Sequence, residues 1–169
     1  MRTFVGLIFI FTIGCLIVCS PSTTSQLERN KAVVGQLLEA INTRNYDLLD
    51  EIVAPNFVRH CQATPDIHVK SRSELKQYLQ SDLKVFPDSR IKLDMIIAEG
   101  NMIAGYFTYT ATQQGPMGSF PATGRKVELG YLSIMRLENG KIAEMWVEWD
   151  NLAILRQLGL LPPQETIEE

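Results

Sequence analysis

The sequence is poor in the residues that build metal centres, disulfides and the common hydrolase motifs. Its 169 residues include three cysteines and two histidines, and these do not stand at the spacing of a metal-ligand set. A Gly-rich phosphate loop, a GxSxG elbow and an HExxH motif are all missing from the sequence. We therefore expect no metal site.

Clustered positive charge is also missing. The 16 Lys and Arg residues are scattered among 19 Asp and Glu residues, which gives a formal net charge of -3. Nucleic-acid binding needs a basic patch, so DNA and RNA are excluded as expected partners. With 46% hydrophobic residues the chain can bury one core, and its length is too short for two ordinary domains.

The N-terminus has the layout of a secretory signal. Arg2 is followed by an uncharged apolar run over residues 4–18 and then by small polar residues. The run is shorter than the roughly 20 residues of a membrane-spanning helix. We expect an exported protein, periplasmic, secreted or anchored, with cytoplasmic retention as the alternative. Cys15 or Cys19 would carry the lipid if the segment were a lipoprotein signal that attaches the chain to a membrane.

Removal of that segment leaves Cys61 as the only thiol, so the mature chain has no disulfide. A lone cysteine is more often a small buried hydrophobe than a nucleophile. We divide the chain into a signal and linker over residues 1–25, one domain over residues 26–164, and a short tail over residues 165–169. The polar stretch at residues 21–26 is interpreted as the linker.

Helical periodicity comes first in the domain. Apolar residues recur at helical spacing over residues 34–41. Asp47 is expected to cap a second helix over residues 48–53, which ends before Pro55 because the residue before a proline avoids helical geometry. Two helices are therefore predicted before the first strand.

A third helix has a capping-box signature, in which the Ser71 hydroxyl and the Glu74 carboxylate cap each other's backbone. The apolar period then changes to two. This period predicts strands over residues 91–97, 103–109, 127–137 and 142–149. Asn139 and Gly140 predict a tight hairpin between the last two.

Helices followed by consecutive antiparallel strands indicate an α+β domain with helices on one face of a curved sheet. The Gly- and Pro-rich connection at residues 113–124 is expected to be an ordered loop, at a sheet edge or over the mouth of a cavity.

Asp150 has two competing interpretations. It precedes a short amphipathic stretch that ends in Gly159, which makes it a good helix N-cap. A cap keeps the carboxylate ionised and weakens it as a base. Burial beside Trp146 and Trp149 would instead desolvate the carboxylate and strengthen it as a base.

Strand alternation places Glu144, Trp146, Glu148 and Asp150 on one face of the last strand. Carboxylates facing the helices would be costly to bury unless a pocket receives them. His60 follows "PNFVR" on a short edge strand, where a single histidine is more often structural than catalytic.

The segments "APNFVRH", "ATGRKVELG" and "WVEWDNLAILRQLG" carry a resemblance to a known family. Together with the flanking residues, from about residue 30 to residue 159, they resemble the SnoaL-like polyketide (ester) cyclases of the nuclear transport factor 2-like superfamily. The resemblance implies a cone-shaped, curved antiparallel sheet with the N-terminal helices packed on its concave face around an apolar pocket.

The resemblance also implies a site. In this family an aspartate at the position of Asp150 is the acid/base of an intramolecular aldol ring closure, without a metal or an organic cofactor. His60 is then our candidate donor to the enolate oxygen. Side chains that we expect around the substrate pocket are Trp146, Glu148, Tyr106, Tyr131 and Phe57.

We therefore expect an ester cyclase or isomerase that acts on a small, carbonyl-rich, hydrophobic substrate. The alternative is an exported domain that binds a small hydrophobic ligand without transforming it. A homodimer or homotetramer is the expected assembly. If Glu148 and Asp150 are both buried, one of them should be protonated.

Overall fold

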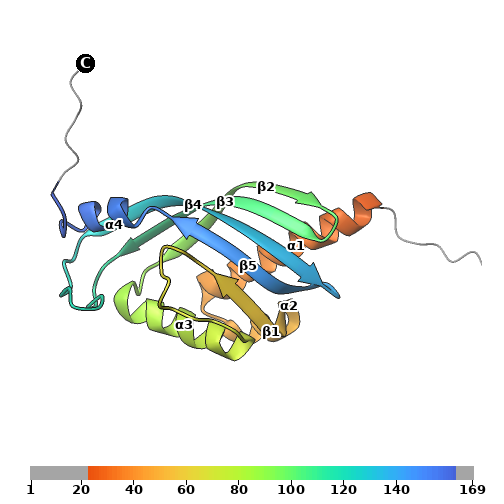
Figure 1. Ribbon diagram of the computed structural model, residues 1–169, viewed down its shortest axis with the longest axis horizontal. Coiled ribbons are helices and arrows are strands. Elements are labelled where there is room, and N and C mark those ends of the chain that lie inside the picture. The colour runs from red at the N-terminus through yellow and green to blue at the C-terminus, as the bar shows by residue number, and fades with distance from the viewer. Residues whose placement is uncertain (1–22, 163–169) are drawn as a thin grey trace, which may run out of the picture.

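The computed structural model describes residues 23–162, and the predicted signal segment with Cys15 and Cys19 lies outside this range (Figure 1). Three helical elements precede the first strand, and four consecutive strands follow the third α-helix. Their bounds are α1 Thr23–Thr43, η1 Tyr46–Leu48 (a 3-10 turn), α2 Leu49–Ile52, β1 Val53–His60, α3 Arg72–Val85, β2 Arg90–Glu99, β3 Met102–Thr112, β4 Lys126–Glu138, β5 Lys141–Trp149 and α4 Asn151–Gln157.

The first helix begins earlier than the sequence predicts. Four of the six residues interpreted as a linker are already helical, because α1 starts at Thr23. Side-chain hydrogen bonds stabilise this first part: Arg29 Nη2 donates to Gln26 Oε1 at 2.8 Å, and Gln26 Nε2 donates to Asn30 Oδ1 at 2.8 Å. In the part of the chain that the structure describes, no helix is long and apolar enough to cross a membrane.

The second helix is shorter than predicted. Asp47 does not cap it, because the chain passes through the turn η1 before α2 begins, and the residue before η1, Asn45, makes no side-chain cap. Val53, predicted to be helical, starts β1 and pairs with Ile142 of β5. Backbone pairing with a long strand therefore overrides the local helical pattern at this position.

The third helix has the cap that the sequence predicts. Ser71 Oγ accepts a hydrogen bond from the Glu74 backbone N–H at 3.1 Å. The Glu74 carboxylate reaches one residue further back than a capping box requires and accepts from the Lys70 N–H at 2.6 Å. α3 is thus fixed at its first turn, with Leu75 buried.

The five strands form one sheet in the order β1-β5-β4-β3-β2. β2 to β5 are antiparallel neighbours, as predicted, and the edge strand β1 adds to β5 in parallel. Pro55 is tolerated in β1 because an edge strand leaves one side of its backbone unpaired. Asn139 and Gly140 both have positive φ, at 50° and 76°, which is the geometry that the predicted hairpin between β4 and β5 needs.

The helices α1 and α3 cover one face of the sheet, which we call the inner face, and leave the other, the outer face, uncovered by helices (Figure 1). This confirms the predicted α+β fold with helices packed on one side of a curved sheet. The main core lies between α1, α2, α3 and the inner face. Its fully buried members include Val34, Leu49, Phe57, Ile103 and Ile142.

The connection between β3 and β4 is an ordered loop. Gln113 is fully buried beneath it. The side-chain Nε2 of Gln113 donates to the carbonyls of Gly115 and Pro121, both at 3.2 Å, and its Oε1 accepts from the Thr123 hydroxyl at 2.7 Å. One buried amide therefore ties both ends of the loop together.

Candidate functional site

The predicted site residues lie in three different places. His60, Trp146, Glu148 and Tyr106 lie on the outer face. Asp150 stands at the junction of β5 and α4, and Tyr131 and Phe57 face the inner side of the sheet. The structure therefore does not bring the predicted residues together in one pocket.

On the outer face, His60 belongs to a network with a carboxylate and a cation. Its Nε2 lies 2.7 Å from Glu144 Oε1, and Arg136 Nε donates to Glu144 Oε2 at 2.9 Å. Hydrogen bonds from His60 and Arg136 lower the pKa of Glu144. The His60 ring stacks on Trp146 at a centroid distance of 5.1 Å. His60 is thus held by an ionised partner and a flat aromatic surface.

Glu148 and Tyr106 have local structural roles on the same face. The Glu148 carboxylate accepts from the backbone N–H of Gln62 at 2.7 Å and of Ala63 at 3.2 Å, which fastens the loop after β1 to β5. Tyr106 is 41% exposed and pairs in register with Leu132. Glu148 and Asp150 are both exposed, so they do not form the buried carboxyl pair that the sequence analysis considered.

Asp150 is the N-cap of α4. Its Oδ1 accepts from the Ala153 backbone N–H at 3.0 Å, and the residue is exposed. His60 is in register with Trp146, four residues before Asp150, so about 13 Å of strand separates the two predicted catalytic groups. A substrate that touched both groups would have to extend along the outer face.

The inner face holds the two remaining predicted residues. Phe57 is fully buried in the core. Tyr131 is partly buried and stacks on Phe107 at a centroid distance of 5.1 Å. Burial raises the pKa of the Tyr131 hydroxyl, so this phenol stays protonated near neutral pH.

Close to Tyr131, the inner face carries a carboxyl that the sequence analysis did not single out. Asp82 of α3 accepts from the Tyr109 hydroxyl, with its Oδ2 at 3.3 Å from the phenol oxygen. Desolvation raises the pKa of Asp82 to about 6, although the hydrogen bond from Tyr109 and the charge of Arg44 both lower it. Burial also raises the pKa of Tyr109. Asp82 therefore titrates near neutral pH beside a neutral phenol.

The inner face also carries a buried cation. Arg59 of β1 is 7% exposed, and its guanidinium carbon lies 4.8 Å from the ring centroid of Tyr78 and 5.6 Å from that of Trp149. Burial raises the pKa of Tyr78 to about 12, while the charge of Arg59 opposes this shift. Tyr78 stands one helical turn from Asp82 on α3, so the two groups are neighbours.

These residues form what we call the inner cluster: Arg59, Tyr78, Asp82, Tyr109, Tyr131 and Trp149. All except Arg59 remain partly exposed, in contrast to the closed core around Phe57 and Phe107. The cluster is built from α3 and from four strands of the sheet. It combines flat aromatic surface with one cation and one carboxyl of raised pKa.

The sequence contains signals for two members of the inner cluster, Arg59 and Asp82. Strand alternation puts Arg59 on the same face as Phe57, whereas its neighbour His60 faces the other way. On α3, Asp82 follows Leu75 by seven residues and Leu79 by three, so it falls on the apolar stripe of the helix. A carboxylate on a buried stripe is an unusual position that could have been noticed.

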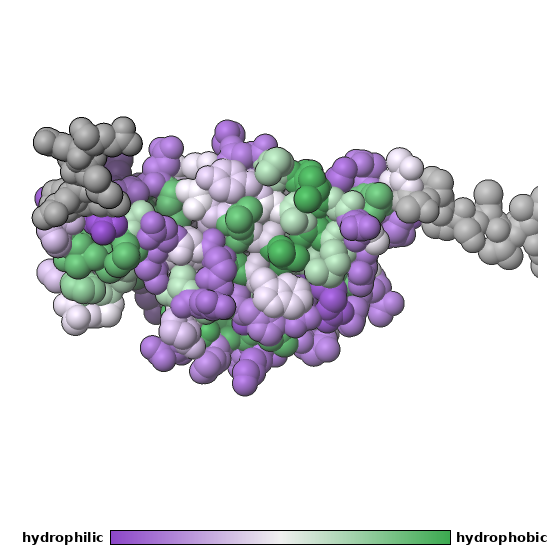
Figure 2. Space-filling model, turned by 45° about the horizontal axis from the view of Figure 1, so that its top comes forward, coloured by the Kyte–Doolittle hydropathy of each residue, from purple (hydrophilic) through white to green (hydrophobic). Residues whose placement is uncertain are grey.

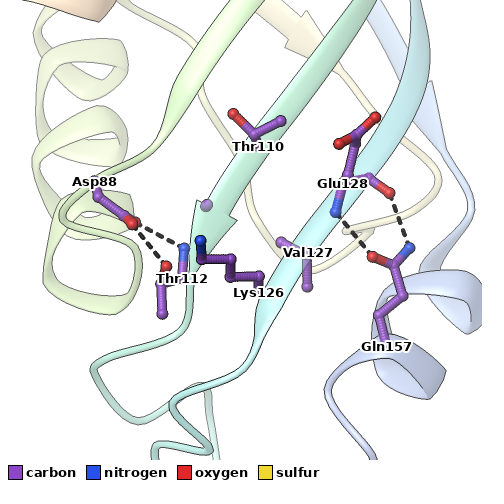
Figure 3. A pocket seen from close by; sticks show the side chains of 8 residues that line it. Asp88, Thr110, Thr112, Lys126, Val127, Glu128 and Gln157 are labelled. Atoms are coloured by element: carbon purple, nitrogen blue, oxygen red, sulfur yellow. Dashed lines mark hydrogen bonds between the residues drawn. The ribbon is translucent and has the colours of Figure 1, made fainter.

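A separate hollow of about 390 Å³ lies at the far ends of β3 and β4, next to α4 (Figure 3). Three of its polar side chains, those of Asp88, Thr112 and Gln157, are already hydrogen-bonded. Asp88 accepts from the backbone and hydroxyl of Thr112 at 2.7 and 2.6 Å, and Gln157 bonds the backbone of Glu128. The hydrogen bonds from Thr112 lower the pKa of Asp88, which weakens this carboxyl as a base near neutral pH. Within residues 23–162, no group of His, Cys, Asp and Glu is arranged to hold a metal ion.

Fold and site together define an α+β protein whose curved sheet and helices enclose an aromatic inner cluster. The family model of the SnoaL-like polyketide cyclases matches residues 31–158. The chain therefore belongs to the SnoaL-like polyketide cyclase family. No curated protein matches the sequence.

Solved structures agree with this assignment. The chain is similar to IdmH, a candidate polyketide cyclase from Streptomyces antibioticus, with 28% identity and a TM-score of 0.68 over 77% of this chain and 98% of that one. It is also similar to AclR, a candidate hydroxylase from Streptomyces galilaeus, with 27% identity and a TM-score of 0.69 over 80% and 99% of the two chains. A candidate SnoaL-like cyclase from Jannaschia sp. CCS1 shares the fold, with a TM-score of 0.74 at 18% identity over 85% and 100%.

Proposed function

We propose that this protein catalyses a cofactor-independent cyclisation or isomerisation of a small, carbonyl-rich, hydrophobic substrate bound at the inner cluster. The observation that carries the proposal is the placement of Asp82 between Tyr109 and Tyr78, in an aromatic surrounding that raises its pKa to about 6. A general base works best when its pKa is close to the working pH.

The chemistry needs only the groups of the inner cluster. The Asp82 carboxylate takes a proton from the carbon next to a substrate carbonyl. The C–H electron pair becomes the C=C bond of an enolate, and the carbonyl π pair moves onto the oxygen. Tyr109, which is protonated at neutral pH, is placed to return a proton. In a ring closure the enolate carbon attacks a second carbonyl, whose oxygen then takes up the proton, so no oxidant or reductant is consumed.

The sequence-based prediction places the same chemistry elsewhere, with Asp150 as the base and His60 as the donor. In that arrangement the substrate lies on the outer face, along Trp146 and Glu148. Asp150 is accessible but caps α4, and His60 is paired with Glu144. The two arrangements use different aspartates, so one pair of variants separates them.

The experiment follows hydrogen-deuterium exchange at the α-carbon of acetophenone, a small aromatic ketone, by NMR in buffered D₂O. We expect the protein to accelerate exchange, Asp82→Asn to lose about 100-fold of that acceleration, and Asp150→Asn to retain most of it. A large loss of acceleration in Asp150→Asn, with most of it retained in Asp82→Asn, would instead place the reaction at Asp150. Circular dichroism verifies that both variants fold.

A wild-type protein that binds the ketone without accelerating exchange would favour the alternative function, a domain that holds a small hydrophobic ligand without transforming it. Binding is measured in the same samples from the line width of the acetophenone signals.

We also propose that a second copy of the chain covers the outer face. Apolar side chains line up across the strands in register: Met95, Tyr106 and Leu132 in one row, and Ile97, Ala104, Ile134 and Trp146 in the next. All of them except Ala104 and Trp146 are exposed. Figure 2 shows apolar side chains gathered on this face among hydrophilic ones. Charges of both signs border the rows, so an identical face meets complementary charge in a two-fold arrangement.

Export is a further proposal, based on the charge and apolar pattern of residues 1–20. Expression with and without this segment, followed by cell fractionation, tests it. Replacement of Cys15 and Cys19 by serine, one at a time, shows whether either residue is lipid-modified.

A further inference from the structure

Asn151, the first residue of α4, uses both ends of its side-chain amide. Its Oδ1 accepts a hydrogen bond from the indole Nε1–H of Trp149 at 2.7 Å, and its Nδ2 donates to the backbone carbonyl of Ala63. An indole N–H only donates and a carbonyl only accepts, so a group between them has to accept at one end and donate at the other. A carboxamide meets this requirement, whereas a carboxylate or an ammonium does not.

The Trp149 indole stands at the end of the sheet, where strand pairing stops. Trp149 is the last residue of β5, and its pairing with Tyr131 is the last one between β4 and β5 on that side. The ring centroid lies 5.6 Å from the guanidinium carbon of the buried Arg59. Because backbone pairing does not continue past Trp149, the orientation of its ring depends on side-chain contacts such as the hydrogen bond to Asn151.

The loop after β1 is fastened at the same place. The Thr64 hydroxyl of this loop accepts from Arg59 Nη1 at 3.2 Å. Together with the two hydrogen bonds of Asn151, this bond completes a closed ring of contacts, which runs from Arg59 through Thr64 and Ala63 to Asn151 and returns through Trp149. Asn151 is the member of this ring that joins the loop to the indole.

Asp150 supports this arrangement from its position between Trp149 and Asn151. Its Oδ1 accepts from the Ala153 N–H at 3.0 Å, which fixes the first turn of α4 and with it the backbone of Asn151. The three consecutive residues thus have separate roles: a ring against the guanidinium, a helix cap, and a bridge to the loop.

We propose that Asn151 is a positioning residue of the inner cluster, which holds the Trp149 ring against Arg59 and keeps the loop after β1 at the end of β5. The inference rests on the proposed function, because that function places the substrate at the inner cluster. Asn151 itself is exposed and acts through Trp149, which supplies one flat wall of the site. Asp82 lies on α3 and is bonded to Tyr109. Loss of Asn151 should therefore weaken the binding of a ketone more than it slows proton removal.

The indole N–H signals of ¹⁵N-labelled protein test the hydrogen bond directly. The sequence has two tryptophans, and Trp146→Phe assigns their two signals. We expect Asn151→Ala to shift the Trp149 signal and to speed exchange of its indole proton with water about fivefold, because the proton loses its acceptor. The signal of Trp146, on the outer face, should not change. Asn151→Asp, whose carboxylate still accepts from the indole, should retain the slow exchange.

The same variants are compared in the acetophenone exchange reaction over a range of ketone concentrations. Asn151→Ala should raise the concentration that gives half-maximal exchange about fivefold and lower the maximal rate by about twofold at most. Asn151→Asp should recover most of the lost affinity. Because Asn151 is exposed, these variants are expected to fold, which circular dichroism verifies.

Gln157→Ala is the matched control. It removes a side-chain amide from the other end of α4, where Gln157 bonds the backbone of Glu128. This substitution loosens the docking of the same helix without removing a bond to Trp149. It should leave both the Trp149 signal and the half-maximal concentration unchanged.

An unchanged Trp149 signal in Asn151→Ala would overturn the inference. Equal effects of Asn151→Ala and Gln157→Ala would also overturn it, because Asn151 would then only support α4. A changed signal with an unchanged half-maximal concentration would show that Trp149 is not a wall of the site. The proposed function can fail separately: if the wild-type protein does not accelerate exchange, the affinity for acetophenone, measured from its line width, decides the inference in place of the half-maximal concentration.

Discussion

Among single residues, Asp82 links the electrostatics of the inner cluster to stability. Burial raises its pKa from 3.8 to about 6 in the folded protein. Between about pH 4 and pH 6 the folded state holds a proton that the unfolded state has lost, so this group makes stability fall as pH rises through the window. Four other carboxyls have lowered pKa values: Asp50, Asp88, Asp94 and Glu144. Ionisation of these groups stabilises the folded state, and this contribution is lost only as the solution becomes more acidic than that window.

We predict that Asp82→Asn is more stable than the wild type at pH 7.5, on the order of 1 kcal/mol, and equal to it near pH 4. Urea unfolding at the two pH values measures the difference. Asp66→Asn, in an exposed loop, should show no such dependence on pH. A difference between Asp82→Asn and the wild type that is the same at both pH values would contradict this account.

The adjacent residues Arg59 and His60 show the limit of predicting single site residues from the sequence. The histidine is the more common catalytic residue type, so it was chosen, but it lies on the outer face beside Glu144. Strand alternation alone would have assigned Arg59 to the inner face with Phe57. The packing of Arg59 against the rings of Tyr78 and Trp149 is different: it depends on contacts between β1, α3 and β5 that the sequence does not reveal.

At the scale of elements, α3 carries two members of the inner cluster, Tyr78 and Asp82, and its start is fixed by Ser71. We predict that Ser71→Ala lowers the free energy of unfolding by about 1 kcal/mol, because the Glu74 N–H loses its acceptor. Ser73→Ala, an exposed position in the first turn, is the control and should change stability little. Equal effects of the two substitutions, measured by urea unfolding, would argue against the cap.

Element prediction succeeded where the pattern is local. The cap at Ser71, the hairpin at Asn139 and Gly140, and the antiparallel strands β2 to β5 all follow from short-range signals. The start of β1 at Val53 does not, because its strand geometry comes from pairing with Ile142, almost ninety residues later. Non-local pairing of this kind has no signature in a single sequence.

At the scale of the whole molecule, the outer face is the surface that we propose to form the interface with a second copy of the chain. Met95, Ile97 and Leu132 are 60%, 64% and 59% exposed, and large contiguous apolar patches on soluble proteins mark interaction surfaces. We predict a dimer in solution that Ile97→Asp or Leu132→Asp converts to a monomer, measured by light scattering after gel filtration. Ile67→Asp, at an exposed apolar residue of a loop, is the control and should leave the dimer intact. A wild-type protein that is monomeric at high micromolar concentration would contradict the proposed interface.

The location of the ligand site tests the account most directly. Tyrosines report on it because Tyr106 lies on the outer face, whereas Tyr78, Tyr109 and Tyr131 belong to the inner cluster. Protein labelled with 3-fluorotyrosine, with signals assigned from single Tyr→Phe variants, is titrated with acetophenone and followed by ¹⁹F NMR. We predict that the signals of Tyr78, Tyr109 and Tyr131 shift while that of Tyr106, on the outer face, does not. A shift confined to Tyr106 would place the ligand on the outer face beside Trp146 and contradict the inner-cluster site.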